Sequence, residues 1–249
     1  MSEGVRARRA APGRRPRTVL ALDAAGSACS VALWRAGRVL ARRFETMTRG
    51  QSERLVPMLE EVMAEAGLGY EALDAIAVTL GPGGFTGVRI GLATARGLAL
   101  ARGLALIGVS NFEAVAAAVP KRQRRGRILA VLLDAKRAEL YAQAFDAAFA
   151  PLTGPRAVAP QALDAVLPAG PVILAGDAVD QAQAALTAAG RNLVLAESEG
   201  LADAAVVARL AAARPLPGPD APAPRPLYLR DPDVTLPDGT RPPAVGDAR

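Results

Sequence analysis

Two short apolar runs that each end at an aspartate stand at corresponding places in the two halves of this chain. They are residues 18–23 (TVLALD) and residues 128–134 (ILAVLLD), and a turn and a second strand-like run follow each of them. Apolar runs bounded by turn residues predict buried β-strands. The repetition of strand, aspartate, turn and strand predicts a duplicated α/β unit, with two lobes and a hinge over residues 109–127.

Helices are expected between these strands. Apolar residues recur at helical spacing over residues 52–66, and a second helix is expected over residues 86–102, directly after a glycine-rich turn. Ser110 can cap a helix over residues 112–119, and residues 201–213 also have helical character. Together with the strands, these helices predict mixed sheets covered by helices in both lobes.

The same pattern divides the chain into four parts. Residues 1–17 are expected to be a disordered basic arm, residues 18–109 the first lobe and residues 110–213 the second lobe. Residues 214–249 are rich in proline and too poor in apolar residues to fold alone. Their one apolar patch, residues 226–230, is expected to dock on the body.

The most distinctive segment is residues 81–91 (GPGGFTGVRIG), with five glycines and one proline. A glycine-rich turn at a helix N-terminus is a common anion site, but this turn lacks the dinucleotide fingerprint and the Lys-Ser/Thr of a Walker loop. Glycine inside a helix costs about 1 kcal/mol relative to alanine, so the small residues that recur every four positions along the following helix need a reason. These are Gly87, Gly91, Ala95 and Ala99.

Close approach of another backbone is that reason, and it has two forms. The stripe packs within its own lobe, or it contacts a helix of a partner subunit; the sequence leaves both open. In the second case the partner surface also includes the apolar side of the neighbouring helix. The interface residues predicted on this basis are Leu55, Leu59, Val62, Gly87, Gly91, Ala95 and Ala99.

Histidine is absent from the 249 residues, and Cys29 is the single cysteine. This composition excludes Ser-His-Asp and Cys-His nucleophiles and every metal site that contains histidine. It also excludes an internal disulfide and fits a reducing compartment, so a cytoplasmic protein is expected, with Cys29 as a small core residue. No apolar run of 18 residues is free of charge, so no membrane span is expected.

The formal net charge of +6 is unevenly distributed. Residues 1–17 hold six arginines and one glutamate, and residues 121–127 (KRQRRGR) hold five cationic residues and no acidic one. The remainder of the chain is therefore mildly acidic. A solvated arm and loop are the simpler interpretation, and contact with RNA phosphates is the alternative.

Asp23, with Gly26, Ser27 and Ser30, resembles the first phosphate loop of the actin-like ATPase and sugar-kinase superfamily, and Asp134 occupies the second such position. In that superfamily such an acid holds a metal–nucleotide. Ala24 and Ala25, however, stand where a binding loop needs a hydroxyl or a glycine, and no glycine follows Asp134. Asp23 and Asp134 are therefore expected to be degenerate cofactor-binding positions, with no cofactor and no metal bound.

Six segments of the chain are similar to the TsaB (YeaZ) family, and the similarity runs from about residue 18 to residue 233. The most specific of them is the glycine-rich element. They are residues 19–23 (VLALD), 30–33 (SVAL), 51–57 (QSERLVP), 81–99, 133–141 (LDAKRAELY) and 226–230 (PLYLR).

This resemblance implies an actin-like fold of two duplicated lobes and a non-catalytic subunit of the bacterial machinery for tRNA threonylcarbamoyladenosine. In that family the subunit pairs with TsaD, which carries the metal and the transferase site, and a small ATPase, TsaE, joins them. TsaD transfers a threonylcarbamoyl group from its adenylate to the adenosine beside the anticodon. Two helices of the first lobe contact TsaD or a second copy of the subunit, and here these are residues 52–66 and 86–102.

The chain also departs from the family pattern. Ala24 and Ala25 replace the usual Thr-Ser after the first aspartate, and Gln51 stands where the family often has histidine. The paired-histidine metal motif of the catalytic paralogue cannot exist here, so a protease activity is excluded. Two other functions remain as alternatives: an active small-molecule kinase of the same fold that uses Asp23 and Asp134, and a stand-alone RNA-binding protein.

Overall fold

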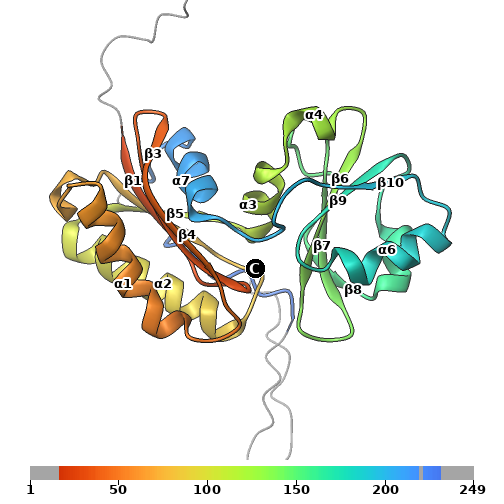
Figure 1. The fold of residues 1–249 in the computed structure, drawn as a ribbon, viewed down its shortest axis with the longest axis horizontal. Helices are drawn as coiled ribbons and strands as arrows, with labels where there is room; N and C mark the ends of the chain where they lie inside the picture. Colours follow the sequence, from red (N-terminus) through yellow and green to blue (C-terminus); the bar gives the residue numbers. More distant parts are fainter. Residues whose placement is uncertain (1–16, 219–220, 231–249) are drawn as a thin grey trace, which may run out of the picture.

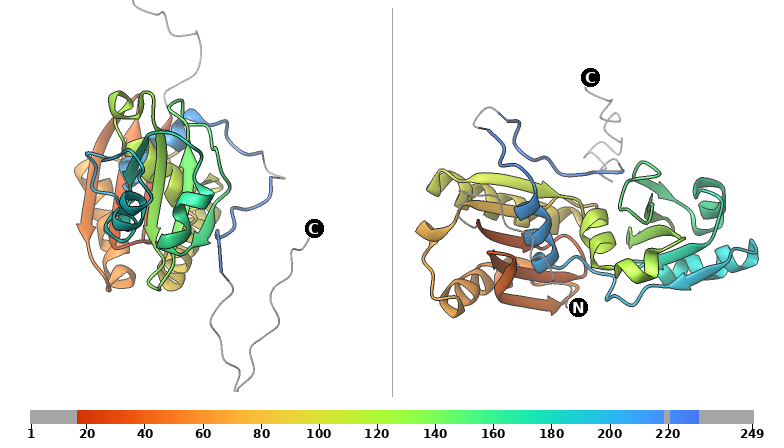
Figure 2. Two further views of the ribbon diagram at one scale, coloured as in Figure 1. Left: turned by 90° about the vertical axis from the view of Figure 1, so that its right-hand side faces the viewer. Right: turned by 90° about the horizontal axis from the view of Figure 1, so that it is seen from above.

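The computed structural model describes residues 17–218 and 221–230, so most of the basic arm and the end of the tail lie outside the described residues. Two α/β lobes lie side by side, and the first contains the red to yellow elements of Figure 1 and the second the green to cyan ones. Each lobe is built around one five-stranded sheet of the described chain. Figure 2 shows the lobes from the side and from above.

The first sheet has the strand order β3-β2-β1-β4-β5. β1, β2 and β3 pair antiparallel as a meander, and β4 and β5 follow parallel to β1. Helix α2 connects the last two strands as a crossover, as parallel neighbours require. The strands are β1 (Thr18–Asp23), β2 (Ala28–Arg35), β3 (Arg38–Thr46), β4 (Ala75–Thr79) and β5 (Ala105–Val109).

The second sheet repeats this arrangement in the order β8-β7-β6-β9-β10. β6 pairs antiparallel with β7 and parallel with β9, as β1 does with β2 and β4. The duplication predicted from the two strand–aspartate runs is thus confirmed, and the shared topology is that of the actin-like fold. The strands are β6 (Ile128–Asp134), β7 (Leu140–Phe145), β8 (Arg156–Val158), β9 (Val172–Ala175) and β10 (Leu193–Leu195).

Two long helices cover one face of the first sheet, and they begin and end within one residue of the predicted bounds. They are α1 (Gln51–Glu65) and α2 (Phe85–Arg102), and a short 3₁₀ turn, η1 (Tyr70–Ala72), lies between them in the chain. The opposite face is covered by α7 (Ala204–Ala213), which packs on β1 and β2. The sequence assigns residues 201–213 to the second lobe, whereas α7 crosses back to the first sheet.

Helix α3 (Asn111–Ala118) connects the lobes and packs against β6 of the second sheet. Its start carries the expected cap: the Ser110 hydroxyl accepts from the backbone N–H of Glu113, whose carboxylate accepts from the N–H of Ser110 in return. The other face of the second sheet is covered by short elements. They are η2 (Pro160–Ala162), α5 (Leu163–Val166) and α6 (Val179–Ala188), while α4 (Lys121–Arg124) lies ahead of β6.

The core of each lobe has two layers, because successive side chains of a strand point to opposite faces. In β1, Leu20 and Leu22 face α1 and α2, while Val19 and Ala21 face α7. The α7 side is built mostly from alanine and valine, so this helix lies close to the sheet. Few aromatic side chains contribute, and Phe112 is the largest fully buried one. Cys29 is buried in the first layer, as expected.

The end of the described chain forms an extended strap, residues 221–230, that runs along one side of the first lobe and reaches the second (Figure 2). The backbone N–H of Leu227 donates to the carbonyl of Leu80 at 2.7 Å, and the side chains of Leu227 and Leu229 pack on the α3 layer of the second lobe. Residues 226–230 therefore dock on the body. None of the described helices is both long and apolar enough to span a membrane.

Candidate functional site

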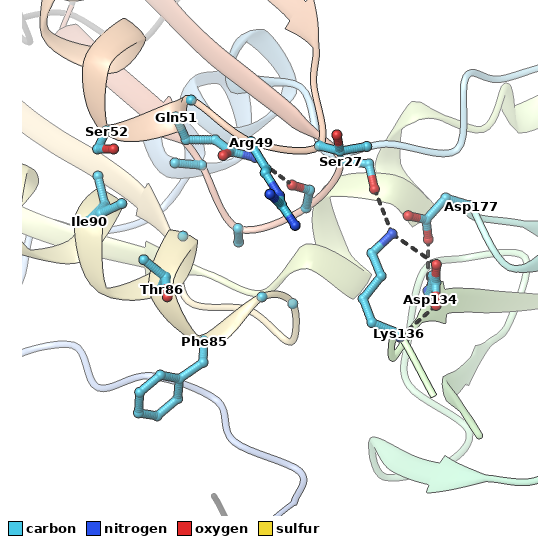
Figure 3. Close-up of a pocket in the computed structure, with 18 residues that line it drawn as sticks. Ser27, Arg49, Gln51, Ser52, Phe85, Thr86, Ile90, Asp134, Lys136 and Asp177 are labelled. Atoms are coloured by element: carbon cyan, nitrogen blue, oxygen red, sulfur yellow. Dashed lines mark hydrogen bonds and ion pairs between the residues drawn. The ribbon is translucent and has the colours of Figure 1, made fainter. Parts of the chain in front are cut away.

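A cleft of about 580 Å³ lies between the lobes. Its first-lobe wall is made by the turn after β1, the start of α1 and the start of α2, and the second lobe contributes Asp134, Lys136 and Asp177 (Figure 3). Both Asp134 and the turn after Asp23 thus reach the position predicted from the repeated pattern. The carboxyl end of β1 and the carboxyl end of β6 meet at this cleft, where open α/β sheets commonly bind ligands.

The glycine-rich turn packs directly on the turn after β1. The N–H of Gly84 donates to the carbonyl oxygen of Ala25 at 2.7 Å. A Cβ at Gly83 would lie 2.2 Å from the same oxygen, and a Cβ at Gly87 would lie 2.0 Å from the carbonyl oxygen of Ala24. The glycines therefore permit backbone-to-backbone packing within one lobe, which decides between the two forms of close approach that the sequence left open.

Asp23 lies beneath this contact and is 1% exposed, so it does not line the cleft. Its Oδ1 accepts from the hydroxyl of Thr79, the N–H of Ala25 at 3.3 Å and the amide of Asn111 at 3.4 Å. Its Oδ2 has no hydrogen-bond partner among the described residues. Burial raises the pKa of Asp23 to about 6, although the three hydrogen bonds to its carboxylate act to lower the pKa. Asp23 therefore holds the ends of β1 and β4 together and does not reach a ligand.

Asp134 faces the cleft, and Lys136, two residues later, lies in the cleft beside it. Lys136 Nζ lies 2.9 Å from Asp134 Oδ2 and donates to Ser27 Oγ of the other lobe at 3.0 Å. The N–H of Asp134 in turn donates to Asp177 Oδ1 at 2.8 Å. Partial burial acts to raise the pKa of Asp134, but the hydrogen bonds from Lys136 outweigh it and the net shift is downward. The positive charge of Lys136 thus neutralises the Asp134 carboxylate from within the same chain.

Asp177, which the sequence did not single out, completes this group. Burial raises its pKa, against the hydrogen bond from Asp134 and the charge of Lys136. It follows β9, the counterpart of β4 in the first lobe, and the apolar run before it in the segment VILAGD could have indicated it. Within the described part of the chain, no group of three or more His, Cys, Asp or Glu side chains is arranged to hold a metal ion.

The arrangement offers little for nucleophilic or acid–base chemistry. Burial raises the pKa of the Cys29 thiol to about 12, so the thiolate is not populated at neutral pH. The two carboxylates expected to handle a metal–nucleotide are engaged separately, Asp23 by Thr79 and Asp134 by Lys136. The contact from Lys136 to Ser27 crosses the cleft and joins the two lobes.

The residues predicted to form a partner interface lie inside the first lobe. Each of the apolar residues named on α1 is at most 2% exposed, and Gly91, Ala95 and Ala99 face the sheet rather than solvent. Gly91, for example, lies against Leu22 and Val78. The prediction chose the sheet-facing side of both helices, because that side has the strongest helical pattern. The residues concerned are Leu55, Leu59, Val62, Gly87, Gly91, Ala95 and Ala99.

The outer side of these helices has a small-residue row of its own. Along α2, Ala93, Gly97 and Ala101 recur every four positions and are exposed. A Cβ at Gly97 would meet nothing within 4 Å. Two large apolar side chains of the same helices are exposed, Leu100 of α2 at 86% and Val56 of α1 at 50%. We call this the outer helix face, and it consists of Val56, Pro57, Ala93, Gly97, Leu100 and Ala101.

The strap borders the outer helix face. The Tyr228 ring stacks on Phe85 at a centroid distance of 5.5 Å, and Arg89 lies 3.5 Å over the Phe85 ring. Arg89 also donates from Nε to the Tyr228 hydroxyl at 3.1 Å. Arg230 continues to the second lobe, where it pairs with Glu139 at 2.8 Å. The strap therefore ties the start of α2 to the second lobe.

Comparison with known proteins places this arrangement among characterised sequences. The family model of TsaD, tRNA N6-adenosine threonylcarbamoyltransferase, matches residues 39–212. The chain is 42% identical over 123 residues to the tRNA threonylcarbamoyladenosine biosynthesis protein TsaB of Escherichia coli. This match covers 49% of the chain and 52% of that protein, so the chain spans about half the length of this curated relative.

Longer matches cover nearly the whole fold. An uncharacterised protein of Mycobacterium tuberculosis is 35% identical over 220 residues, which are 87% of this chain and 93% of that protein. A crystal structure of a Pseudomonas aeruginosa protein, described as similar to the peptidase YeaZ, superposes with a TM-score of 0.72 at 29% identity. It covers 86% of this chain and 100% of that one.

Proposed function

The chain belongs to the TsaB (YeaZ) family, and we propose that it is a non-catalytic subunit of tRNA threonylcarbamoyladenosine synthesis. In this role it completes and stabilises TsaD, which transfers the threonylcarbamoyl group to the adenosine beside the anticodon. TsaE joins the same complex, tRNA is bound by the complex as a whole, and the assembly works in the cytoplasm. The subunit itself uses no cofactor and performs no proteolysis.

The observation that carries this proposal is that both candidate nucleotide-binding aspartates are engaged within the chain. Asp23 is buried beneath the turn on which Gly83, Gly84 and Gly87 pack, and Thr79 donates to it. Lys136 neutralises Asp134 from within the chain. An ATP-dependent kinase of this fold needs both positions free, so the kinase alternative is disfavoured. Calorimetric titration with ATP and Mg²⁺ tests it, since tight binding by the isolated chain would favour a kinase.

The outer helix face is the surface that fits a partner helix pair. Small residues at Ala93, Gly97 and Ala101 allow another helix backbone to approach closely, and Leu100 and Val56 are exposed knobs for its grooves. Exposed large apolar side chains of this kind are typical of protein interfaces. We propose that TsaD covers this face in the complex, and that a second copy of the chain covers it when TsaD is absent.

The proposed role predicts a specific loss in the cell. Depletion of the protein should lower threonylcarbamoyladenosine in bulk tRNA, measured by mass spectrometry of nucleosides, and the wild-type chain should restore it. Unchanged levels after depletion would overturn the role itself.

The proposed interface predicts a separate loss in the test tube. Ala93→Arg and Gly97→Arg should abolish co-purification with TsaD, because each places a long charged side chain on the outer helix face. Ala184→Arg is the matched control, since Ala184 is also an exposed helix position but lies on α6 of the second lobe. Co-purification that survives both changes on α2 would mean that another surface binds TsaD.

A further inference from the structure

The surface around α4 is strongly cationic. Residues 121–127 hold Lys121, Arg122, Arg124, Arg125 and Arg127, and Lys121, Arg122 and Arg125 are exposed. The segment contains no acidic and no apolar side chain. Five like charges in seven residues repel one another, so their placement on one short helix and loop needs either local neutralisation or an anionic partner.

Local neutralisation is incomplete. Arg122 pairs with Glu197 at 2.6 Å, but both side chains are about 70% exposed, so this pair contributes little. Arg124 is used within the fold, donating to the carbonyl of Ala147 and lying 5.8 Å over the Phe149 ring. Lys121 and Arg125 contact no carboxylate among the described residues. Most of the positive charge of α4 therefore faces solvent.

A further arginine extends this surface toward the first lobe. Arg209 of α7 is exposed and donates to the carbonyl of Ala117, near the end of α3 and close in sequence to Lys121. Helices α3 and α7 pack on each other, and Figure 1 shows α3 between α7 and α4. The chain also enters the described structure on this side, since Arg17 donates to the carbonyl of Arg214 just after α7. The cationic surface thus spans both lobes.

We propose that this surface, formed by Lys121, Arg122, Arg125 and Arg209, binds the sugar–phosphate backbone of tRNA. The inference rests on the proposed function and names the part of the subunit that meets the substrate. A phosphate backbone needs only accessible cations, and the planar fork of arginine matches its oxygens. An acidic protein partner is a poorer fit, because protein interfaces need an apolar or aromatic centre and α4 has none.

The position of the surface agrees with this assignment. In Figure 1, α1 and α2 lie on the outer side of the first lobe, whereas α4 lies at the top of the second lobe, near α3. A partner that covers the outer helix face therefore leaves the α4 surface open. RNA bound there and TsaD bound to α2 do not compete for the same residues.

The test is the salt dependence of tRNA binding by the complex with TsaD and TsaE. Lys121→Gln combined with Arg125→Gln removes two exposed cations without removing any ion pair seen in the described chain. The slope of log affinity against log salt concentration should become shallower by about two for the double variant, at about 0.9 per phosphate contact. When the salt concentration rises from about 50 to 200 mM, the factor by which affinity falls should then be about ten times smaller for the variant than for the wild type.

The control is Arg156→Gln combined with Arg225→Gln, which removes the same charge from exposed positions on β8 and the strap. Its slope should match that of the wild type. Equal slopes for the two double variants would overturn the α4 assignment. Weaker TsaD binding by the α4 variant without tRNA would also overturn it, in favour of an acidic protein contact.

These outcomes are separable from failure of the proposed function. If the wild-type chain restores threonylcarbamoyladenosine in depleted cells while the α4 variant binds tRNA with an unchanged slope, only the surface assignment fails. If depletion leaves the modification unchanged, the role fails whatever the binding data show.

Discussion

Gly87 and Ala24 are in such close backbone contact that no other residue fits at position 87. A Cβ there would lie 2.0 Å from the carbonyl oxygen of Ala24, and backbone cannot swing away as a flexible side chain can. The contact joins the first turn of α2 to the turn after β1. The glycine-rich motif thus fixes how the helix leaves the sheet.

Gly87→Ala should therefore destabilise the first lobe. Relief of the clash requires a shift of α2 or of the turn after β1, and overpacking of this kind costs about 1–3 kcal/mol. The free energy of unfolding, measured in urea, should fall by that amount. Gly97→Ala on the same helix is the control: its Cβ meets nothing, so it should stabilise the chain by up to about 1 kcal/mol. A wild-type stability for Gly87→Ala would contradict the packing described.

Local pattern predicted the elements of the first lobe well, because the information lies within each segment. The apolar run 18–23 with its terminal aspartate, the Ser110 cap and the glycine-rich start of α2 are readable from neighbouring residues. The repeat of the first signal in residues 128–134 also revealed the duplication.

The sequence does not show in the same way which element packs against a given face of a helix. The stripe from Gly87 to Ala99 predicts a close approach, but the backbone that approaches Gly87 belongs to Ala24, far away in the sequence. For the same reason the sequence pattern does not show which lobe α7 joins, because an alanine-rich helix fits either sheet. The contact between Lys136 and Ser27 joins the two lobes and has no local signal.

Asp23→Asn should change how stability depends on pH. Burial raises the pKa of Asp23 from 3.8 to about 6, so the folded chain binds this proton more tightly than the unfolded chain. The contribution of Asp23 to stability is therefore fully present below pH 3.8 and is lost as the pH rises through 6. Asparagine stays neutral, so its stability relative to the wild type should rise by on the order of 2 kcal/mol between pH 4 and pH 8.

Urea unfolding of both proteins across that range measures this difference. Asp134→Asn provides a comparison of opposite sign, because the pKa of Asp134 is lowered in the folded chain. Asp134→Asn should lower the free energy of unfolding near neutral pH, and this effect should disappear in acid. A difference between Asp23→Asn and the wild type that does not vary with pH would mean that Asp23 is not titrating in the folded state.

Two substitutions at Lys136 should separate the stability that its side-chain contacts contribute from the cost of its left-handed backbone. Lys136 has a φ of 57°, a left-handed conformation that costs a non-glycine residue about 1 kcal/mol. Both Lys136→Ala and Lys136→Gly lose the side-chain contacts to Asp134 and Ser27. Alanine keeps the backbone strain, whereas glycine relieves it. Lys136→Gly should therefore be the more stable variant by about 1 kcal/mol in urea unfolding. Both should show faster hydrogen exchange at residues 24–27, and equal stabilities would argue against the left-handed backbone.

Tyr228→Ala should release the strap from the start of α2. The ring stacks on Phe85, and stacked aromatic pairs contribute about 0.5–1.5 kcal/mol beyond their buried area. Tyr228→Phe keeps the stack and loses only the hydrogen bond from Arg89, so its effect should be smaller. Hydrogen exchange of the Leu227 N–H, which donates to the carbonyl of Leu80, reports the release, and it should be fastest for Tyr228→Ala and close to wild type for Tyr228→Phe. Equal rates for the two variants would assign the docking to Leu227 and Leu229 instead.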